Sequence, residues 1–251
     1  MASLLISLKT LYIVLMCIMA VAIAYTLVID GDSSCFDLSA RWTIVAVTDF
    51  LVFMVLIVAW YFYKESSWIK RIVFIIMIFW CGSVVTCGYI SMLLFKLPPE
   101  ESLKDALYFV LPKHQNRDVT GHTIRSSVVT AKVIVTAIGC CMLGVTIYAY
   151  IIDGFPFFVE VLTPCTITAL TDVYIHIVVF SVWIAYKESS WISALFWILL
   201  LVCFSSIAIC IYIVRELFYL SPGQPISLIL FNNSNRDMSS SDPLLIVRSD
   251  V

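Results

Sequence analysis

An internal repeat constrains this chain more than any other feature of its sequence. The heptapeptide YKESSWI occurs at residues 63–69 and again at residues 186–192, which is 123 positions later. Aligning residues 1–99 with residues 124–222 at this offset, without a gap, gives 31 identities in 99 positions. Lysines, aspartates and tryptophans are among the matched residues, and a shared apolar composition would not align these. The sequence therefore predicts a tandem duplication of a domain-sized unit.

The composition places this duplicated unit in a lipid bilayer. Hydrophobic residues make up 62% of the chain and charged residues only 13%, with a mean hydropathy of +1.02. Soluble domains are about 45–50% apolar and about 25% charged. The sequence has no basic patch with interleaved aromatic residues, so nucleic acid is not expected as a partner. The predicted surroundings are lipid.

Each repeat contains three apolar runs of about 20 residues, the length that a helix needs to cross a membrane. The fold class is therefore predicted to be an all-α integral membrane protein with six transmembrane helices in two three-helix repeats. Because three is odd, the second repeat would begin on the opposite side of the membrane. This predicts an inverted topology, which recurs among transporters. The predicted spans are 10–29, 43–63, 72–95, 133–152, 166–186 and 195–218.

The remaining segments are polar. Residues 100–123 link the repeats, and their apolar spacing predicts a short amphipathic helix on the membrane surface. Residues 223–251 form a polar tail with the composition of a disordered segment. The first YKESSW copy is followed by more basic residues than the second, which favours a cytosolic N-terminus. An endomembrane or the plasma membrane is the expected location.

The two YKESSW copies are predicted to be tight polar hairpins between the second and third spans. The aromatic residues would lie at the membrane interface, the charged residues would keep the turn hydrated, and a serine would cap the next helix. Identical residues in both copies suggest a further constraint, such as packing between the two tryptophans. The candidate residues are Tyr63, Lys64, Glu65 and Trp68 in the first copy and Tyr186, Lys187, Glu188 and Trp191 in the second.

Two aspartates lie inside predicted spans. Asp49 and Asp172 occupy equivalent positions, six residues into the second span of each repeat, or about 9 Å below the interface. Ionisable groups at this depth are functional candidates. Two interpretations are open. Asp49 could pair with Lys132 and Asp172 with Lys9, tying the repeats together, or both lysines could extend to the headgroups while each aspartate bonds a nearby hydroxyl.

His176 breaks the symmetry, because Phe53 is its counterpart in the first repeat. It follows Asp172 by four residues and shares its helix face. Such a pair could relay protons or bind a cation, since imidazole titrates near neutrality; a simple interhelical hydrogen bond is the alternative. Most of the nine cysteines lie in apolar runs. Neither a disulfide framework, a metal site nor a cofactor motif is predicted.

Residues 163–214 carry a recognisable pattern: TPCTITALTDVYIHIVVFSVWIAYKESSW, followed by the apolar sequence ISALFWILLLVCFSSIAICIYIV. This pattern resembles a plant family with bacterial relatives that is catalogued as a domain of unknown function. The family pattern has tryptophan after Thr-Pro, where this chain has Cys165. The resemblance touches both repeats and implies a multi-span membrane protein of plant origin.

Three functions fit these observations. Transport of a small solute or of protons at the interface between the repeats is the first, with Asp49, Asp172 and His176 as the polar site. A non-catalytic membrane scaffold or subunit is the second. A membrane-embedded enzyme acting on a lipid or isoprenoid is the third, but the chain lacks hydrolase, zinc-protease and phosphate-binding motifs. The sequence therefore favours a protein that is not an enzyme.

Overall fold

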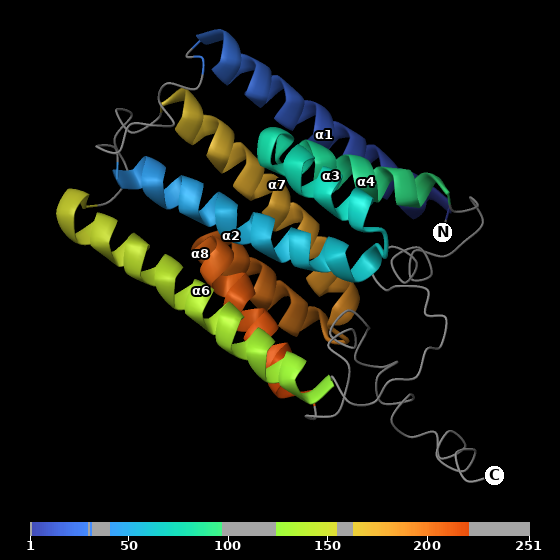
Figure 1. Ribbon diagram of the computed structural model, residues 1–251. Helices are drawn as coiled ribbons and strands as arrows, with labels where there is room; N and C mark the ends of the chain where they lie inside the picture. Colours follow the sequence, from blue (N-terminus) through green and yellow to red (C-terminus); the bar gives the residue numbers. More distant parts are fainter. Residues whose placement is uncertain (1, 30, 32–40, 97–123, 155–162, 221–251) are drawn as a thin grey trace.

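The computed structural model describes residues 2–29, 31, 41–96, 124–154 and 163–220 (Figure 1). Over these residues the chain forms seven α-helices and no strand, which confirms the all-α prediction for this part of the chain. The predicted surface helix within 100–123 and the tail 223–251 lie outside the described residues. The helices are α1 (Ala2–Ile29), α2 (Arg41–Lys64), α3 (Trp68–Cys81), α4 (Ser83–Phe95), α6 (Ile124–Asp153), α7 (Pro164–Lys187) and α8 (Trp191–Phe218).

Several of these helices have the length and composition of membrane spans. Among the described residues, five helices are long and apolar enough to cross a bilayer, and α4 is a shorter apolar helix. Many large apolar side chains are exposed on the outside of the bundle, as expected where lipid replaces water. The chain is therefore consistent with a multi-pass membrane protein. The five segments are Leu5–Ile29, Arg41–Lys64, Val128–Asp153, Pro164–Lys187 and Trp191–Phe218.

One residue interrupts the third apolar run of each repeat. Gly82 separates α3 from α4 and has φ 50° and ψ −134°. Ser205, at the equivalent position of α8, has φ 48° and ψ −126°. Positive φ is a conformation that glycine adopts readily and other residues rarely adopt. The continuous helices that were predicted over 72–95 and 195–218 are therefore wrong.

The chain reverses direction at both interruptions. The rings of Phe74 and Tyr89 lie 6.1 Å apart although fifteen residues separate them along the chain. Their equivalents, Trp197 and Tyr212, lie 5.1 Å apart. Fifteen residues of uninterrupted helix would span about 22 Å. The pair α3–α4 and the two halves of α8 are therefore helical hairpins, and each hairpin begins and finishes at the same end of the bundle.

The second helices of the two repeats, α2 and α7, run parallel (Figure 1). Near their starts, Thr43 Oγ1 lies 2.6 Å from Thr166 Oγ1. Further along, the ring of Phe53 stacks on His176 with centroids 5.8 Å apart. Both pairs are matched at the 123-residue offset, and neighbouring helices meet at matched positions at two depths only when they are parallel. The prediction of inverted repeats is therefore wrong, because the returning hairpin makes the second repeat begin at the same end as the first.

The two repeats interlock through their first helices. Helix α1 packs on α4 and on α7 of the other repeat, and α6 correspondingly packs on α8 and α2. Thr26, near the end of α1, donates to the Pro164 carbonyl at the start of α7 at 3.1 Å. Arg41, at the start of α2, forms a 2.5 Å ion pair with Asp153 at the end of α6. Each first helix therefore lies antiparallel to the second helix of the other repeat.

One cysteine departs from the sequence prediction. Cys165, at the start of α7, is disulfide-bonded. The other seven cysteines of the described residues are free. The expectation that the chain has no disulfide is therefore wrong. The bond lies at the end of the bundle where α2 and α7 begin.

Candidate functional site

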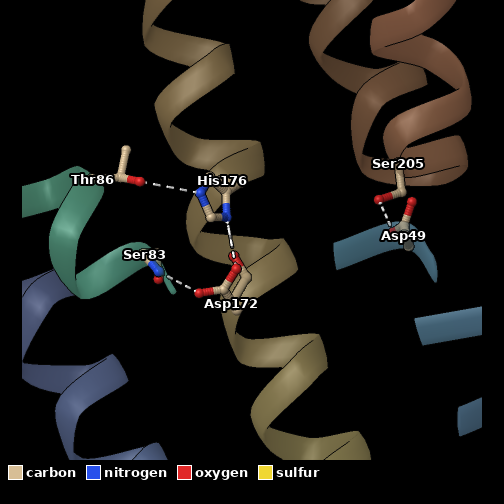
Figure 2. A network of polar contacts seen from close by, with 6 residues as sticks. All are labelled: Asp49, Ser83, Thr86, Asp172, His176 and Ser205. Carbon is tan, nitrogen blue, oxygen red and sulfur yellow. Dashed lines mark hydrogen bonds and ion pairs between the residues drawn. The ribbon is translucent and has the colours of Figure 1, made fainter. Parts of the chain in front are cut away.

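The two intramembrane aspartates lie at equal depth on the parallel helices α2 and α7. Asp49 is eight residues after the first residue of α2, and Asp172 is eight residues after the first residue of α7, or about 12 Å along each helix. Asp49 is 7% exposed and Asp172 is fully buried. Each side chain meets the tip of the helical hairpin that belongs to the other repeat (Figure 2).

Asp172 caps the helix that leaves the first hairpin tip. Its Oδ1 accepts the backbone N–H of Ser83, the first residue of α4, at 2.5 Å. A carboxylate is stabilised here because the first turn of a helix has unpaired N–H groups and the positive end of the helix dipole. Gly82 makes the approach possible, because a Cβ at this position would collide with the Asp172 carboxylate. The glycine is needed both for its positive φ and for this close contact.

Asp49 does the same at the second hairpin tip. Its Oδ1 accepts the backbone N–H of Ser206 at 3.1 Å, and its Oδ2 accepts the hydroxyl of Ser205. Ser205 is a non-glycine residue with positive φ, and the hydroxyl bond to Asp49 is one contact that holds it in that conformation. The aspartates therefore do link the two repeats, as the sequence suggested, but their partners are hairpin tips.

The lysines proposed as partners lie elsewhere. The Lys9 ammonium is 5.3 Å from the centroid of the Phe95 ring, and the Lys132 ammonium is 4.6 Å from that of Phe218. Both hypothesised Lys–Asp pairs are therefore wrong. The reason is the helical hairpin, which returns the chain to the end of the bundle where α1 begins. Helix α6 and Lys132 therefore begin at that end, whereas Asp49 lies nearer the opposite end, where α2 begins. Each lysine instead contacts the end of the hairpin of its own repeat.

His176 is present at only one of the two tips. Its Nδ1 lies 2.8 Å from Asp172 Oδ2 and 3.0 Å from the Asp172 carbonyl oxygen. Its Nε2 faces Thr86 Oγ1 across a longer distance of 3.5 Å. The imidazole is fully buried and stacks on Phe53. The first tip therefore combines a carboxylate, an imidazole and a hydroxyl. Beside the second tip, Phe53 occupies the position that is equivalent to His176.

Each tip also holds a serine hydroxyl, at a position where the sequence suggested only a small residue suited to close helix packing. Ser83 and Ser206 are equivalent residues, both fully buried. Within the described residues, neither Ser83 Oγ nor Ser206 Oγ has a hydrogen-bond partner. Buried polar atoms are normally paired, so each tip has unused hydrogen-bonding capacity beside its aspartate. The signal in the sequence was that the two serines are identical at the 123-residue offset.

Polar side chains connect the first tip with the end of the bundle where α2 and α7 begin. The hydroxyl oxygens of Thr26 and Thr168 lie 2.5 Å apart, and the Thr168 hydroxyl oxygen lies 3.1 Å from the Ala22 carbonyl oxygen. Thr168, Asp172 and His176 follow at four-residue spacing on α7 and lie on one helix face.

Among the described residues no group of three His, Cys, Asp or Glu side chains could hold a metal ion.

The YKESSW copies join α2 to α3 and α7 to α8, and their glutamates contact the hairpin that follows. Glu188 accepts hydrogen bonds from Tyr212 at 3.0 Å, from Arg215 at 3.1 Å and from Ser193 at 2.8 Å. In the first repeat Glu65 lies close enough to Tyr89, the equivalent of Tyr212, to interact with its hydroxyl. This shared contact, which fixes the second arm of each hairpin to the turn, gives one physical reason for the repeated glutamate.

The other hairpin residues differ between the copies. Trp68 is 67% exposed and Trp191 is 88% exposed, so the expected packing between the tryptophans is absent from the described structure. The serines that precede α3 and α8 form no side-chain cap. The expectation that Lys187 keeps its turn hydrated is wrong, because Lys187 is fully buried and forms a 3.1 Å ion pair with Glu216. The signal for this pair in the sequence was Glu216, a charged residue within an apolar run. Tyr63, Lys64 and Tyr186 are partly buried.

The chain was compared with known proteins on three levels. Searches of curated proteins and of solved structures found no match. A family model described as "Protein of unknown function (DUF1475)" matches residues 1–237, which include both repeats, both aspartates and both YKESSW copies. Because the match covers nearly the whole chain, the protein belongs to this family of unknown function.

Proposed function

We propose that this protein moves protons, coupled to a small solute, through the contact between its two repeats. The observation that carries the proposal is the first hairpin tip, where fully buried Asp172 and His176 lie 2.8 Å apart beside the unpaired Ser83 hydroxyl. Intramembrane ionisable residues are costly and mark ion or proton pathways. Broken helices that meet at the interface between repeats are the usual binding sites of secondary transporters.

The proton would be exchanged within the Asp172–His176 pair. An imidazole beside a carboxylate can take up a proton at Nδ1 or Nε2 and pass it on, with little movement of heavy atoms. The threonines near the start of α7 supply hydroxyl groups along the way to this pair. The unpaired hydroxyls of Ser83 and Ser206 would bind polar groups of the solute.

The proposed topology is four membrane crossings, by α1, α2, α6 and α7, and two hairpins that enter and leave at one side. Support comes from the nine Lys and Arg side chains that the structure describes, because eight lie at the hairpin end and only Arg41 lies at the other. This asymmetry supports a cytosolic location for the hairpin end. The eight residues are Lys9, Lys64, Lys70, Arg71, Lys96, Lys132, Lys187 and Arg215.

The disulfide of Cys165 supports the same orientation. It lies at the end opposite to the basic residues, where α7 begins. Disulfides persist in the oxidising compartments outside the cytosol. We therefore propose that the N-terminus is cytosolic and that the protein resides in the plasma membrane or an endomembrane with an oxidising lumen.

A membrane scaffold is the second candidate, and the second tip favours it. Asp49 caps its hairpin with the same geometry as Asp172 but has no imidazole beside it. Capping alone therefore accounts for one of the two aspartates. Under this alternative both aspartates would only hold the hairpins, and no proton would move.

Asparagine separates the two candidates, because it caps a helix about as well as aspartate but does not exchange a proton. The purified protein would be reconstituted in liposomes that contain a pH-sensitive dye, and a pH gradient would be imposed with and without candidate solutes. We expect Asp172→Asn and His176→Phe to abolish proton flux, and Asp49→Asn to retain most of it. Flux that survives both changes at the first tip, or a wild-type protein that moves no protons, would favour the scaffold.

A further inference from the structure

An apolar groove lies on the outer face of the first repeat, between α2 and α3. It has a volume of about 520 Å³ and is lined only by apolar side chains, including those of Leu51, Val55, Ala59, Phe62 and Phe79. Leu51 is 42% exposed and Phe79 is 65% exposed, so the groove opens to the surroundings of the bundle. We call this feature the α2/α3 groove.

The α2/α3 groove has the length of one lipid leaflet. Phe62 lies at the end near the YKESSW turn, and Leu51 lies eleven residues deeper on α2, which is about 16 Å along the helix. Half of a hydrocarbon core of about 30 Å is about 15 Å. An acyl chain that enters from the interface would therefore fill the groove along its whole length.

Cationic side chains lie at the interfacial end of the α2/α3 groove. The Arg71 guanidinium carbon is 5.1 Å from the ring centroid of Phe62, which lines the groove, and 5.1 Å from that of Trp68. Arg71 donates from Nε to the Glu65 carbonyl at 2.8 Å and from Nη2 to the Phe62 carbonyl at 2.7 Å. These bonds hold the guanidinium in place and use two of its five donors. Lys70, whose side chain is 63% exposed, adds a second cation.

The second repeat lacks these features. Ser193 and Ala194 stand where the first repeat has Lys70 and Arg71, and Ala185 stands where it has Phe62. The helical hairpin exists in both repeats, so the hairpin does not require the cations. Formation of the hairpin therefore does not by itself account for Lys70 and Arg71.

We propose that the α2/α3 groove binds one anionic phospholipid of the cytosolic leaflet. An acyl chain would lie in the groove, and the headgroup phosphate would accept hydrogen bonds from Arg71 and Lys70. Glu65 lies 3.2 Å from the Lys70 ammonium, and the phosphate would compete with it for that cation. The inference rests on the proposed placement of the YKESSW turn at the cytosolic interface, and it is independent of proton transport.

The test uses the full-length protein in detergent micelles, with phosphatidylserine and phosphatidylcholine of identical acyl chains as probes. Native mass spectrometry would count the bound lipids and give their relative affinities. We expect one phosphatidylserine to bind in preference to phosphatidylcholine, and Lys70→Gln with Arg71→Gln to reduce phosphatidylserine affinity about tenfold. Because Arg71 also bonds the end of α2, Lys70→Gln alone provides a milder variant, for which we expect a smaller loss. Lys96→Gln, at the same end of the bundle, is the matched control.

The groove itself is tested by Ala59→Phe, which fills it at an exposed position, with Ile76→Phe on the exposed face of α3 as control. We expect the first change, and not the second, to displace both lipids. Equal binding of the two lipids by the wild-type protein would overturn the proposal, as would lipid binding that is unchanged by Ala59→Phe. A change of oligomeric state in this variant would instead show that a second copy of the chain occupies the groove. The assay measures no proton movement, so its result is separate from that of the flux experiment.

Discussion

Replacing Gly82 with alanine tests the proposed geometry of the hairpin tip. Gly82 has φ 50°, and a Cβ there would collide with the carboxylate of Asp172. Alanine must therefore either move the backbone towards a permitted conformation or push Asp172 away from the N–H group of Ser83. In either case the cap on α4 is weakened and the contact between the repeats is disturbed.

The expected cost follows from these contacts. A non-glycine residue in a sparsely populated region of φ/ψ space costs about 1–3 kcal/mol. Loss of the 2.5 Å bond from the Ser83 N–H to the Asp172 carboxylate costs a further 1.5–3 kcal/mol or so, because the acceptor is charged. Alanine restricts the unfolded chain and returns about 0.4–1 kcal/mol. We therefore expect Gly82→Ala to lower the free energy of unfolding by about 2–5 kcal/mol.

The measurement is reversible unfolding in mixed micelles with increasing SDS, followed by tryptophan fluorescence. Gly144→Ala is the matched control, because Gly144 lies inside α6 and a Cβ there would meet nothing within 4 Å. Alanine is favoured over glycine in a helix by about 0.5–1 kcal/mol, so this control is expected to be slightly more stable. If Gly82→Ala were as stable as the wild-type protein while the control behaved as expected, the tip geometry described here would be incorrect.

Three further predictions follow from the hairpins. Single cysteines would be placed at Ser66 and Ser189 in a background without accessible native cysteines. We expect both to react with a membrane-impermeant thiol reagent from the same side of the membrane. Labelling from opposite sides would instead support inverted repeats. Glu216→Gln removes the carboxylate that pairs with the buried Lys187 ammonium, and we expect the free energy of unfolding in SDS to fall by about 3–5 kcal/mol. A fall of less than about 1 kcal/mol would show that the pair is hydrated. Ser205→Ala and Ser205→Gly both remove the hydroxyl bond to the carboxylate, but only glycine adopts the positive φ without strain, so the glycine variant is expected to be the more stable by about 1–3 kcal/mol. The reverse order would mean that Ser205 is not strained.

Sequence reasoning located the parts of the fold that depend on local pattern. The apolar runs predicted α2 and α7 to within two residues at either end, and the YKESSW copies were placed between helices, as they are in the structure. The repeat also identified Asp49 and Asp172 as ionisable residues inside apolar runs, and a connection between the halves was one of the two interpretations left open. These predictions succeed because helix length, turn polarity and the cost of burying a charge can each be read from a short window of sequence.

The helical hairpins could not be predicted in the same way. Residues 72–95 contain no proline, and an apolar run of this length suits either one crossing or two short arms. What stabilises the reversal at Gly82 is Asp172, a residue 90 positions away in the other repeat. The error at the third run then affected the rest of the predicted topology. An uninterrupted third helix would end each repeat at the opposite end of the bundle, and this led to the incorrect Lys–Asp pairs.

The distribution of basic residues distinguishes the two topologies without reference to any local pattern. With three crossings in each repeat, the nine described Lys and Arg side chains would divide five against four between the two sides, which fixes no orientation. With two crossings and a returning hairpin, the same nine divide eight against one. Membrane proteins concentrate Lys and Arg on the cytosolic side, so the second division is the one expected of a protein with a defined orientation. One residue with positive φ in each repeat, Gly82 or Ser205, thus accounts for the parallel course of α2 and α7 and for the contact of each aspartate with the hairpin of the other repeat. It also accounts for the unequal distribution of basic side chains, which an arrangement with six crossings would not have.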